Sequence, residues 1–264
     1  MARPDKLYIG TNTKMYKTIA QTADFLDKLG RHAADIPRDK MELFVIPSFT
    51  ALETAAKYAA PAHIVLGAQN MGWEDEGQFT GEISPLMLKE IGVRVVEIGH
   101  SERRHVLGET DEQENRKVLC AFRHGFVPLL CIGETGTEKD AGISDEILRI
   151  QLKRGLHGVT PIQAKELWIA YEPVWAIGVS GIPASKEYAE EKHQVIRRTL
   201  VELFGGESGG AIPILYGGSV NNENASSLIA MPAVDGLFIG RCAWDADNLN
   251  RIIRDVMPIW GNKR

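Results

Sequence analysis

The chain has 264 residues, of which 44% are hydrophobic and 25% are charged, and its formal net charge is −5. This apolar content excludes a disordered chain, and the mildly acidic balance argues against non-specific binding of nucleic acid. No run approaches the roughly 18 uninterrupted apolar residues of a membrane span, and Met1–Lys6 lacks the apolar core of a signal peptide. We therefore expect no membrane association and a cytoplasmic location.

Eight short apolar runs, each of four to six residues, recur along the chain with amphipathic stretches between them. Most are rich in Val, Ile or Leu, which is typical of strands buried on both faces. In chain order the runs are Leu7–Thr11, Leu43–Ile46, Ile64–Ala68, Val93–Ile98, Val127–Ile132, Leu167–Ala170, Ile212–Tyr216 and Gly236–Ile239. Apolar residues at helical spacing predict helices over Ile19–His32, Glu112–His124 and Lys186–Phe204.

This alternation, at roughly 33 residues per unit, predicts parallel strands joined by right-handed crossovers. Eight such units in about 250 residues match a (β/α)₈ TIM barrel, and we predict a single domain over residues 1–264. The alternative is a doubly wound open sheet, but no G-x-G-x-x-G follows the first run. The glycine-rich segment Gly205–Gly210 is interpreted as a loop before the seventh strand rather than as a linker between domains.

The segment Tyr171–Gly178 places one carboxylate, Glu172, at the end of a buried run and directly before a proline. Because proline cannot continue a central strand, we expect the strand to stop at Glu172. A glutamate at the C-terminal rim of a buried strand, followed by a loop with glycine, is where barrel enzymes keep a general base. The alternative is a strand-end carboxylate that faces solvent.

Two further strand ends carry candidate catalytic side chains. Lys14 follows the first run, where it is either an exposed loop lysine or a fixed positive charge in the barrel mouth. His100 follows the fourth run, and Ser101 with the charges behind it predicts a helix start. A histidine at a helix N-terminus favours the neutral imidazole, which can donate a hydrogen bond to a carbonyl and transfer protons.

The last two predicted strands end in glycines, in Gly217-Gly218-Ser219 and in Gly240 before Arg241. Glycines let backbone N–H groups approach an anion, and these two loops frequently form a phosphate site in barrels. A base, a neutral acid, a cation and an anion cradle together suit proton abstraction beside the carbonyl of a small sugar phosphate. We expect an enediolate mechanism that needs no metal and no cofactor.

Neither the histidines nor the cysteines form a metal motif. His100, Glu102, His105 and Glu109 do not repeat a metal-ligand spacing across strands. The three cysteines, Cys120, Cys131 and Cys242, include no C-x-x-C pair, which fits a reducing compartment and argues against a disulfide scaffold.

The chain resembles the triosephosphate isomerase family over essentially its whole length. The segments that carry the resemblance are Asn12–Met15, Ala68–Asn70, Phe79–Ser84, Gly99–Arg104, Cys131–Glu134, Tyr171–Gly178 and Tyr216–Val220. The resemblance implies that Glu172 is the base and that His100 polarises the carbonyl, while Lys14 supports the developing negative charge and Asn12 helps to orient it. It also implies a supporting role for Glu102.

The same resemblance implies further positions around the substrate. Gly178, Ser219, Gly240 and Arg241 stand at the family's phosphate-contact positions, and Pro173–Trp175 resembles the leading hinge of a lid. Met71–Phe79, ending in Thr80, resembles the loop that reaches into a partner subunit, which implies a homodimer. The alternative for Met71 and Trp73 is a surface loop packed on its own barrel.

Four departures from the family pattern concern the substrate. Thr13 replaces the usual tryptophan, Tyr16 replaces the usual asparagine, and Arg241 replaces a glycine of the last phosphate loop. The lid, Gly178–Ala184, lacks the usual Gly-Lys-Thr-Ala ending. The segment Gly181–Ser185, taken together with Asp235–Arg241 and Ala243-Trp244, more closely resembles a branch that interconverts L-erythrulose 1-phosphate and D-erythrulose 4-phosphate. Thr13 and Tyr16 are unusual in that branch too.

The leading hypothesis is therefore a tetrulose-phosphate isomerase of sugar (erythritol) catabolism. Triose-phosphate isomerisation in glycolysis is the close alternative, because both reactions need the same base and the same acid. A barrel kept only for binding or as a scaffold is a third possibility, which the presence of Lys14, His100 and Glu172 opposes. A lyase or aldolase would require a lysine that forms a Schiff base, or metal ligands, at the strand ends.

Overall fold

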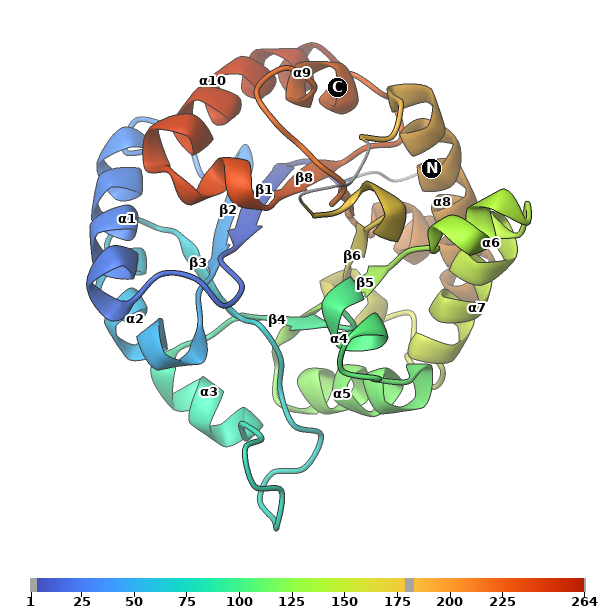
Figure 1. Ribbon diagram of the computed structural model, residues 1–264, viewed down its shortest axis with the longest axis horizontal. Coiled ribbons are helices and arrows are strands. Elements are labelled where there is room, and N and C mark those ends of the chain that lie inside the picture. The colour runs from blue at the N-terminus through green and yellow to red at the C-terminus, as the bar shows by residue number, and fades with distance from the viewer. Residues whose placement is uncertain (1–3, 179–182, 264) are drawn as a thin grey trace.

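The eight predicted strands form a closed parallel barrel in strand order β1 to β8, which excludes the open sheet. The structure is a computed structural model that describes residues 4–178 and 183–263. The strands are β1 (Leu7–Asn12), β2 (Met41–Ile46), β3 (Val65–Ala68), β4 (Val95–Ile98), β5 (Val127–Ile132), β6 (Trp168–Tyr171), β7 (Ile214–Tyr216) and β8 (Gly236–Ile239). Figure 1 shows them at the centre of a ring of helices.

The helices of the described ranges lie between the strands and cover the outside of the barrel (Figure 1). They are α1 (Ile19–His32), α2 (Leu52–Ala59), α3 (Pro85–Ile91), α4 (Ser101–His105), α5 (Asp111–Arg123), α6 (Gly136–Asp140), α7 (Ser144–Gly155), α8 (Lys186–Ala211), α9 (Ala225–Ile229) and α10 (Ala246–Lys263). Short 3₁₀ helices are η1 (Phe49–Ala51), η2 (Gln163–Glu166), η3 (Val174–Ala176) and η4 (Arg241–Trp244).

Alternation along each strand divides the apolar core into two parts. Val96 and Ile98 of β4 face outward and join the core between sheet and helices, whereas Val95 points into the barrel. There it meets side chains such as Phe44 and Trp168, whose ring centroids lie 5.4 Å apart. The barrel interior is therefore packed with side chains, so that a ligand must bind outside it.

The sequence places the strands within one or two residues of their observed bounds. The runs Val127–Ile132 and Gly236–Ile239 match β5 and β8, and the helix Ile19–His32 matches α1. Its start is fixed by a capping box, in which the Thr18 side chain accepts from the Gln21 N–H and the Gln21 side chain accepts from the Thr18 N–H. The sixth strand ends at Tyr171, so that Glu172 is the first residue beyond it.

The interpretation of Gly205–Gly210 as a loop is wrong. Gly205 has a left-handed φ of 81° and ends the first helix of α8, but the chain then turns directly into a second helical segment that runs to Ala211. Gly209 allows this segment to pack closely, because a Cβ atom there would lie 2.2 Å from the Leu200 carbonyl oxygen. Close tertiary packing thus outweighs the low helix propensity of glycine.

Within the described ranges, no helix combines the length and the apolar character needed to span a membrane.

Replacing Gly209 with alanine is expected to lower the free energy of unfolding by about 1–3 kcal/mol, because the new methyl group overlaps the Leu200 carbonyl. Gly206→Ala is the matched control: no atom lies within 4 Å of its Cβ position, so the higher helix propensity of alanine adds about 0.5–1 kcal/mol. Urea unfolding measures both variants. Equal stabilities would contradict the close contact.

Candidate active site

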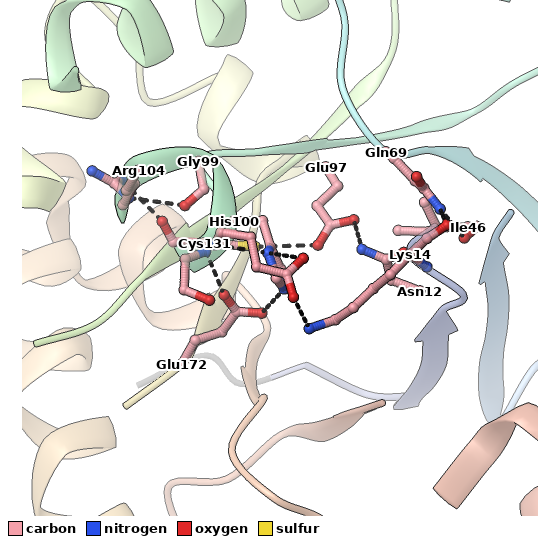
Figure 2. Close-up of polar contacts among 12 residues, drawn as sticks. Asn12, Lys14, Ile46, Gln69, Glu97, Gly99, His100, Arg104, Cys131 and Glu172 are labelled. Carbon is pink, nitrogen blue, oxygen red and sulfur yellow. Dashed lines mark hydrogen bonds and ion pairs between the residues drawn. The ribbon is translucent and has the colours of Figure 1, made fainter. Parts of the chain in front are cut away.

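The predicted site residues meet around one cavity of about 670 Å³ at the C-terminal ends of the strands. Nine residues singled out in the sequence line this cavity: Asn12, Lys14, His100, Glu102, Glu172, Gly178, Ser219, Gly240 and Arg241. They come from five different strand ends, which parallel closure of the barrel brings to one face. Figure 2 shows how Glu172, His100 and Lys14 converge there.

Glu172 is held in place by both its backbone and its carboxylate. Its N–H donates to the Ile132 carbonyl at 2.7 Å, and a Cβ atom at Gly133 would lie 1.8 Å from the Glu172 carbonyl oxygen, so only glycine fits there. Its Oε2 accepts the Ser101 N–H at 3.1 Å. Burial raises the pKa of Glu172 to about 7, although the Lys14 cation and the Ser101 N–H act in the opposite direction. The carboxylate is therefore a stronger base than an exposed glutamate.

His100 faces Glu172, with Nε2 lying 3.4 Å from Oε1 of the carboxylate. It caps helix α4, where its Nδ1 accepts the Glu102 N–H at 3.1 Å. A ring nitrogen that accepts carries no proton, so the hydrogen-bond pattern assigns the proton of the neutral ring to Nε2. Burial lowers the pKa of His100 to about 3, with the charges of Lys14 and Arg103 adding to it. The imidazole is neutral as predicted, but its main cause is burial rather than the helix N-terminus.

Lys14 adopts a left-handed backbone with a φ of 53°. Its N–H donates to Oδ1 of Asn12 at 2.5 Å, and its carbonyl accepts from Gln69 at 2.8 Å. Its ammonium donates to Oε1 of Glu102 at 2.7 Å, and its side chain is 20% exposed. The lysine is thus not a free loop residue, because contacts at both backbone and side chain fix its charge in the barrel mouth.

The glycine-rich ends of β7 and β8 leave backbone exposed to the cavity. Nothing lies within 4 Å of a Cβ position at Gly240, which leaves room for an anion close to the chain. Ser219 donates through both its N–H and its hydroxyl to the Ala176 carbonyl, at 3.2 and 2.6 Å. Anion binding by Ser219 therefore requires this contact to be exchanged. Arg241 is exposed at the start of η4 and supplies a positive charge to the same wall.

Two carboxylates near the site were missed by the sequence reasoning. Glu97 of β4 is fully buried and accepts from Nδ2 of Asn12 at 2.7 Å. A signal was present, since Glu97 is an acidic residue inside a run of buried strand residues. Glu134 is also fully buried, and it accepts from the Tyr171 and Tyr188 hydroxyls and from the Trp175 indole N–H. Its sequence context carried no comparable signal.

Comparison with known proteins agrees with this geometry. A sequence model of triosephosphate isomerase matches residues 7–256. The chain is 47% identical to L-erythrulose-1-phosphate isomerase of Rhizobium etli over 95% of this chain and 92% of the relative. It is 44% identical to the enzyme of the same name from Rhizobium meliloti, over 95% and 98%. It is 45% identical to triosephosphate isomerase of Carboxydothermus hydrogenoformans, over 94% and 98%.

The chain belongs to the triosephosphate isomerase family. It is an isomerase, and this excludes the hypothesis that the barrel serves only for binding or as a scaffold.

Two of the departures from the family pattern, Tyr16 and Arg241, line the cavity, whereas Thr13 does not. Thr13 is fully buried, and its hydroxyl has no hydrogen-bond partner in the described structure. Tyr16 lines the cavity, and its ring lies 4.6 Å from that of Trp244, whose indole donates to the Asn12 carbonyl at 2.9 Å. The departing lid sequence falls largely on residues 179–182, which lie outside the described residues.

Two groups of side chains in the described ranges bring three potential metal ligands within 4.8 Å of one another. Asp75, Cys120 and His124 form one group, in which His124 and Asp75 already pair at 2.7 Å. Glu97, Cys131 and Glu172 form the other. Burial raises the pKa of all three of these groups, which favours their neutral forms and opposes binding of a cation.

The raised pKa of Glu172 predicts a pH-dependent stability difference in the Glu172→Gln variant. In the folded protein Glu172 keeps its proton up to about pH 7, whereas in the unfolded chain it loses the proton near its ordinary pKa. The stability that the protonated group contributes is therefore fully present below the unfolded pKa and is lost as the pH rises from there through about 7. Wild type and variant should therefore be similarly stable near pH 4. Above pH 8 the variant should be more stable, by up to about 3 kcal/mol. Unfolding midpoints across this range test it, and a gap that does not change with pH would contradict it.

Proposed function

We propose that this isomerase moves a proton between adjacent carbons of a small sugar phosphate through an enediolate. The observation that carries the proposal is the 3.4 Å approach of the neutral His100 Nε2 to the Glu172 carboxylate beside the Lys14 ammonium. Proton abstraction from carbon needs a base whose pKa lies near the working pH, and burial supplies it at Glu172. Base and acid lie side by side at the wall of one cavity, so that two adjacent carbons bound there can contact both groups.

Each of the other groups has a role in this reaction. His100 donates from Nε2 to the substrate carbonyl and then transfers protons between the two enediolate oxygens, because a neutral imidazole can both give and accept a proton. Lys14 stabilises the negative charge that develops on those oxygens, and Asn12 holds the lysine. Glu102 orients the ammonium group through its 2.7 Å contact.

The phosphate of the substrate is assigned to the wall formed by Gly178, Ser219, Gly240 and Arg241. Open backbone at Gly240 and the guanidinium of Arg241 suit an anion with several acceptor oxygens. This wall lies in the same cavity as Glu172 and His100, so a short sugar phosphate can reach both.

We infer that the substrate pair is L-erythrulose 1-phosphate and D-erythrulose 4-phosphate. The tetrulose phosphate carries a hydroxymethyl group where dihydroxyacetone phosphate has hydrogen, on the carbon that loses the proton. The same base, acid and phosphate wall therefore serve both molecules. Support for the larger substrate comes from the relatives of Rhizobium etli and Rhizobium meliloti that bear this name, and triose phosphate remains the second candidate because one relative bears that name.

Assaying both substrates side by side tests this inference. The purified protein is expected to show a higher kcat/KM for L-erythrulose 1-phosphate than for dihydroxyacetone phosphate. Glu172→Asp, prepared identically, should lower kcat about 100-fold on either substrate because the carboxylate retreats by one methylene. That variant also reveals any activity from the expression host. A higher kcat/KM for the triose phosphate would contradict the substrate assignment, and near-normal activity of Glu172→Asp would contradict the role of Glu172.

We also propose a homodimer formed through the Met71–Phe79 loop with Thr80. This loop follows β3 and extends away from the barrel in Figure 1. Phe79 is 45% exposed at its end, and Met15, which follows the neighbouring Lys14, is 96% exposed. Met71 itself is fully buried in its own barrel and Trp73 packs against that core, so the contact is assigned to the later part of the loop.

Sedimentation of two variants tests the dimer. Met15→Gln combined with Phe79→Gln should shift the protein from dimer to monomer, because both exposed apolar side chains are removed from the proposed contact. Ile162→Gln is the control, since Ile162 is 81% exposed but precedes β6 at the opposite end of the barrel. A monomeric wild type would overturn the proposal.

The cytoplasm is the proposed location, supported by the free state of Cys120, Cys131 and Cys242.

A further inference from the structure

Glu97 is a carboxyl group enclosed in the apolar interior of the barrel. Alternation along β4 points it inward with Val95, and its partner in the sheet register is Leu129 of β5. None of its surface is exposed, and it is absent from the lining of the 670 Å³ cavity. It therefore cannot touch a substrate bound there, and any effect it has on the reaction must pass through another residue.

A short hydrogen-bond chain connects Glu97 to the Lys14 backbone, as Figure 2 shows. Nδ2 of Asn12 donates to Oε2 of Glu97 at 2.7 Å, and Oδ1 of Asn12 accepts the Lys14 N–H at 2.5 Å. An asparagine amide has one acceptor side and one donor side. Because the Lys14 N–H can only donate, it requires the amide oxygen, and the amide N–H₂ is then directed at Glu97, which accepts from it. Lys14 itself has a left-handed backbone that a lysine rarely adopts.

The surroundings of Glu97 keep it uncharged. Burial raises its pKa well above the ordinary value, and the charge of Glu172 raises it further. Each of these two neighbouring carboxyls accepts one N–H donor and is stabilised by the Lys14 charge, but the pKa of Glu97 is raised well above the ordinary value whereas that of Glu172 is raised only to about 7. Glu172 therefore ionises before Glu97.

The remaining groups around Glu97 do not reverse this balance. The Cys131 thiol of β5 lies 3.8 Å from Oε1 and stays protonated, because burial raises its pKa well above the ordinary value. Asn12 and Lys14 favour the ionised form of Glu97, whereas Glu102 on α4 opposes it, and burial exceeds all three.

We infer that Glu97 is a positioning residue that acts as a neutral carboxylic acid, fixing the Asn12 amide and through it the backbone of Lys14. The inference rests on the proposed function, in which Lys14 stabilises the enediolate. A neutral acid offers one carbonyl acceptor and one hydroxyl donor. A glutamine side chain offers the same pattern in nearly the same shape, whereas a methionine offers neither group.

Glu97→Gln and Glu97→Met separate this role from the alternatives. The glutamine variant should keep kcat within about threefold of wild type. The methionine variant leaves the buried Asn12 N–H₂ without an acceptor and should lower kcat about 10- to 100-fold. In an Asn12→Ala background the further loss caused by Glu97→Met should be less than about threefold, because the connection is already broken.

Three kinetic outcomes would overturn the inference. Equal losses in the two variants would mean that the ionised carboxylate itself is needed. Normal kcat in both would mean that Glu97 only fills the interior, and full additivity with Asn12→Ala would mean that it acts by another route. If the methionine variant does not fold, the pH profile of Glu97→Gln decides: the limb of kcat/KM near pH 7 should coincide with that of wild type, and a displaced limb would show that Glu97 is charged.

The protonation state is measured without turnover by infrared difference spectroscopy. At pH 7 the wild-type spectrum minus that of Glu97→Gln should contain the C=O stretch of a protonated carboxylic acid. A carboxylate band in its place would overturn the inference. If wild type converts neither sugar phosphate, the proposed function fails while this spectrum still reports on Glu97, so the two failures are distinguishable.

Discussion

Removal of the Glu172 carboxylate from water is the constraint on which the rest of the site depends. The carboxylate is 3% exposed, and the charged form loses its hydration without gaining a full set of partners. A buried anion is tolerated only where donors and a cation compensate, and here the Ser101 N–H and Lys14 do so incompletely. Because the compensation is incomplete, the pKa of Glu172 lies near neutral pH, and the carboxylate can act as a base there.

The barrel makes this arrangement possible because it holds the Glu172 backbone and the His100 side chain in fixed positions. The Glu172 backbone is fixed against Ile132 and Gly133 of the neighbouring strand end, which sets the position from which its side chain enters the site. His100 is fixed at the start of α4 by its own capping bond, which leaves one ring nitrogen directed at the reaction space. The two residues are far apart in sequence, and the parallel pairing of β4 and β6 with β5 brings their side chains to a separation of 3.4 Å.

Sequence patterns predicted the barrel because strands that are buried on both faces consist of short, nearly continuous apolar runs. The positions of Lys14, His100 and Glu172 followed, since residues after parallel strands must share one face. The predictions that failed concern features that depend on tertiary contacts. The segment after Gly205 is helical because it packs on Leu200, and burial of His100 outweighs its helix-terminal position. The pairing of Glu97 with Asn12 required knowing that both point into the same interior.

The three side chains that donate to Glu134 hold both ends of the connection between β6 and α8. Trp175 lies near the start of the connection between β6 and α8, and Tyr188 lies in the first turn of α8; both donate to the buried Glu134 carboxylate. The two flanks of that connection are thus anchored independently of the residues between them. A substitution or insertion between these two anchors therefore leaves both points of attachment in place. Length and chemistry can then change there without displacing the catalytic carboxylate or imidazole.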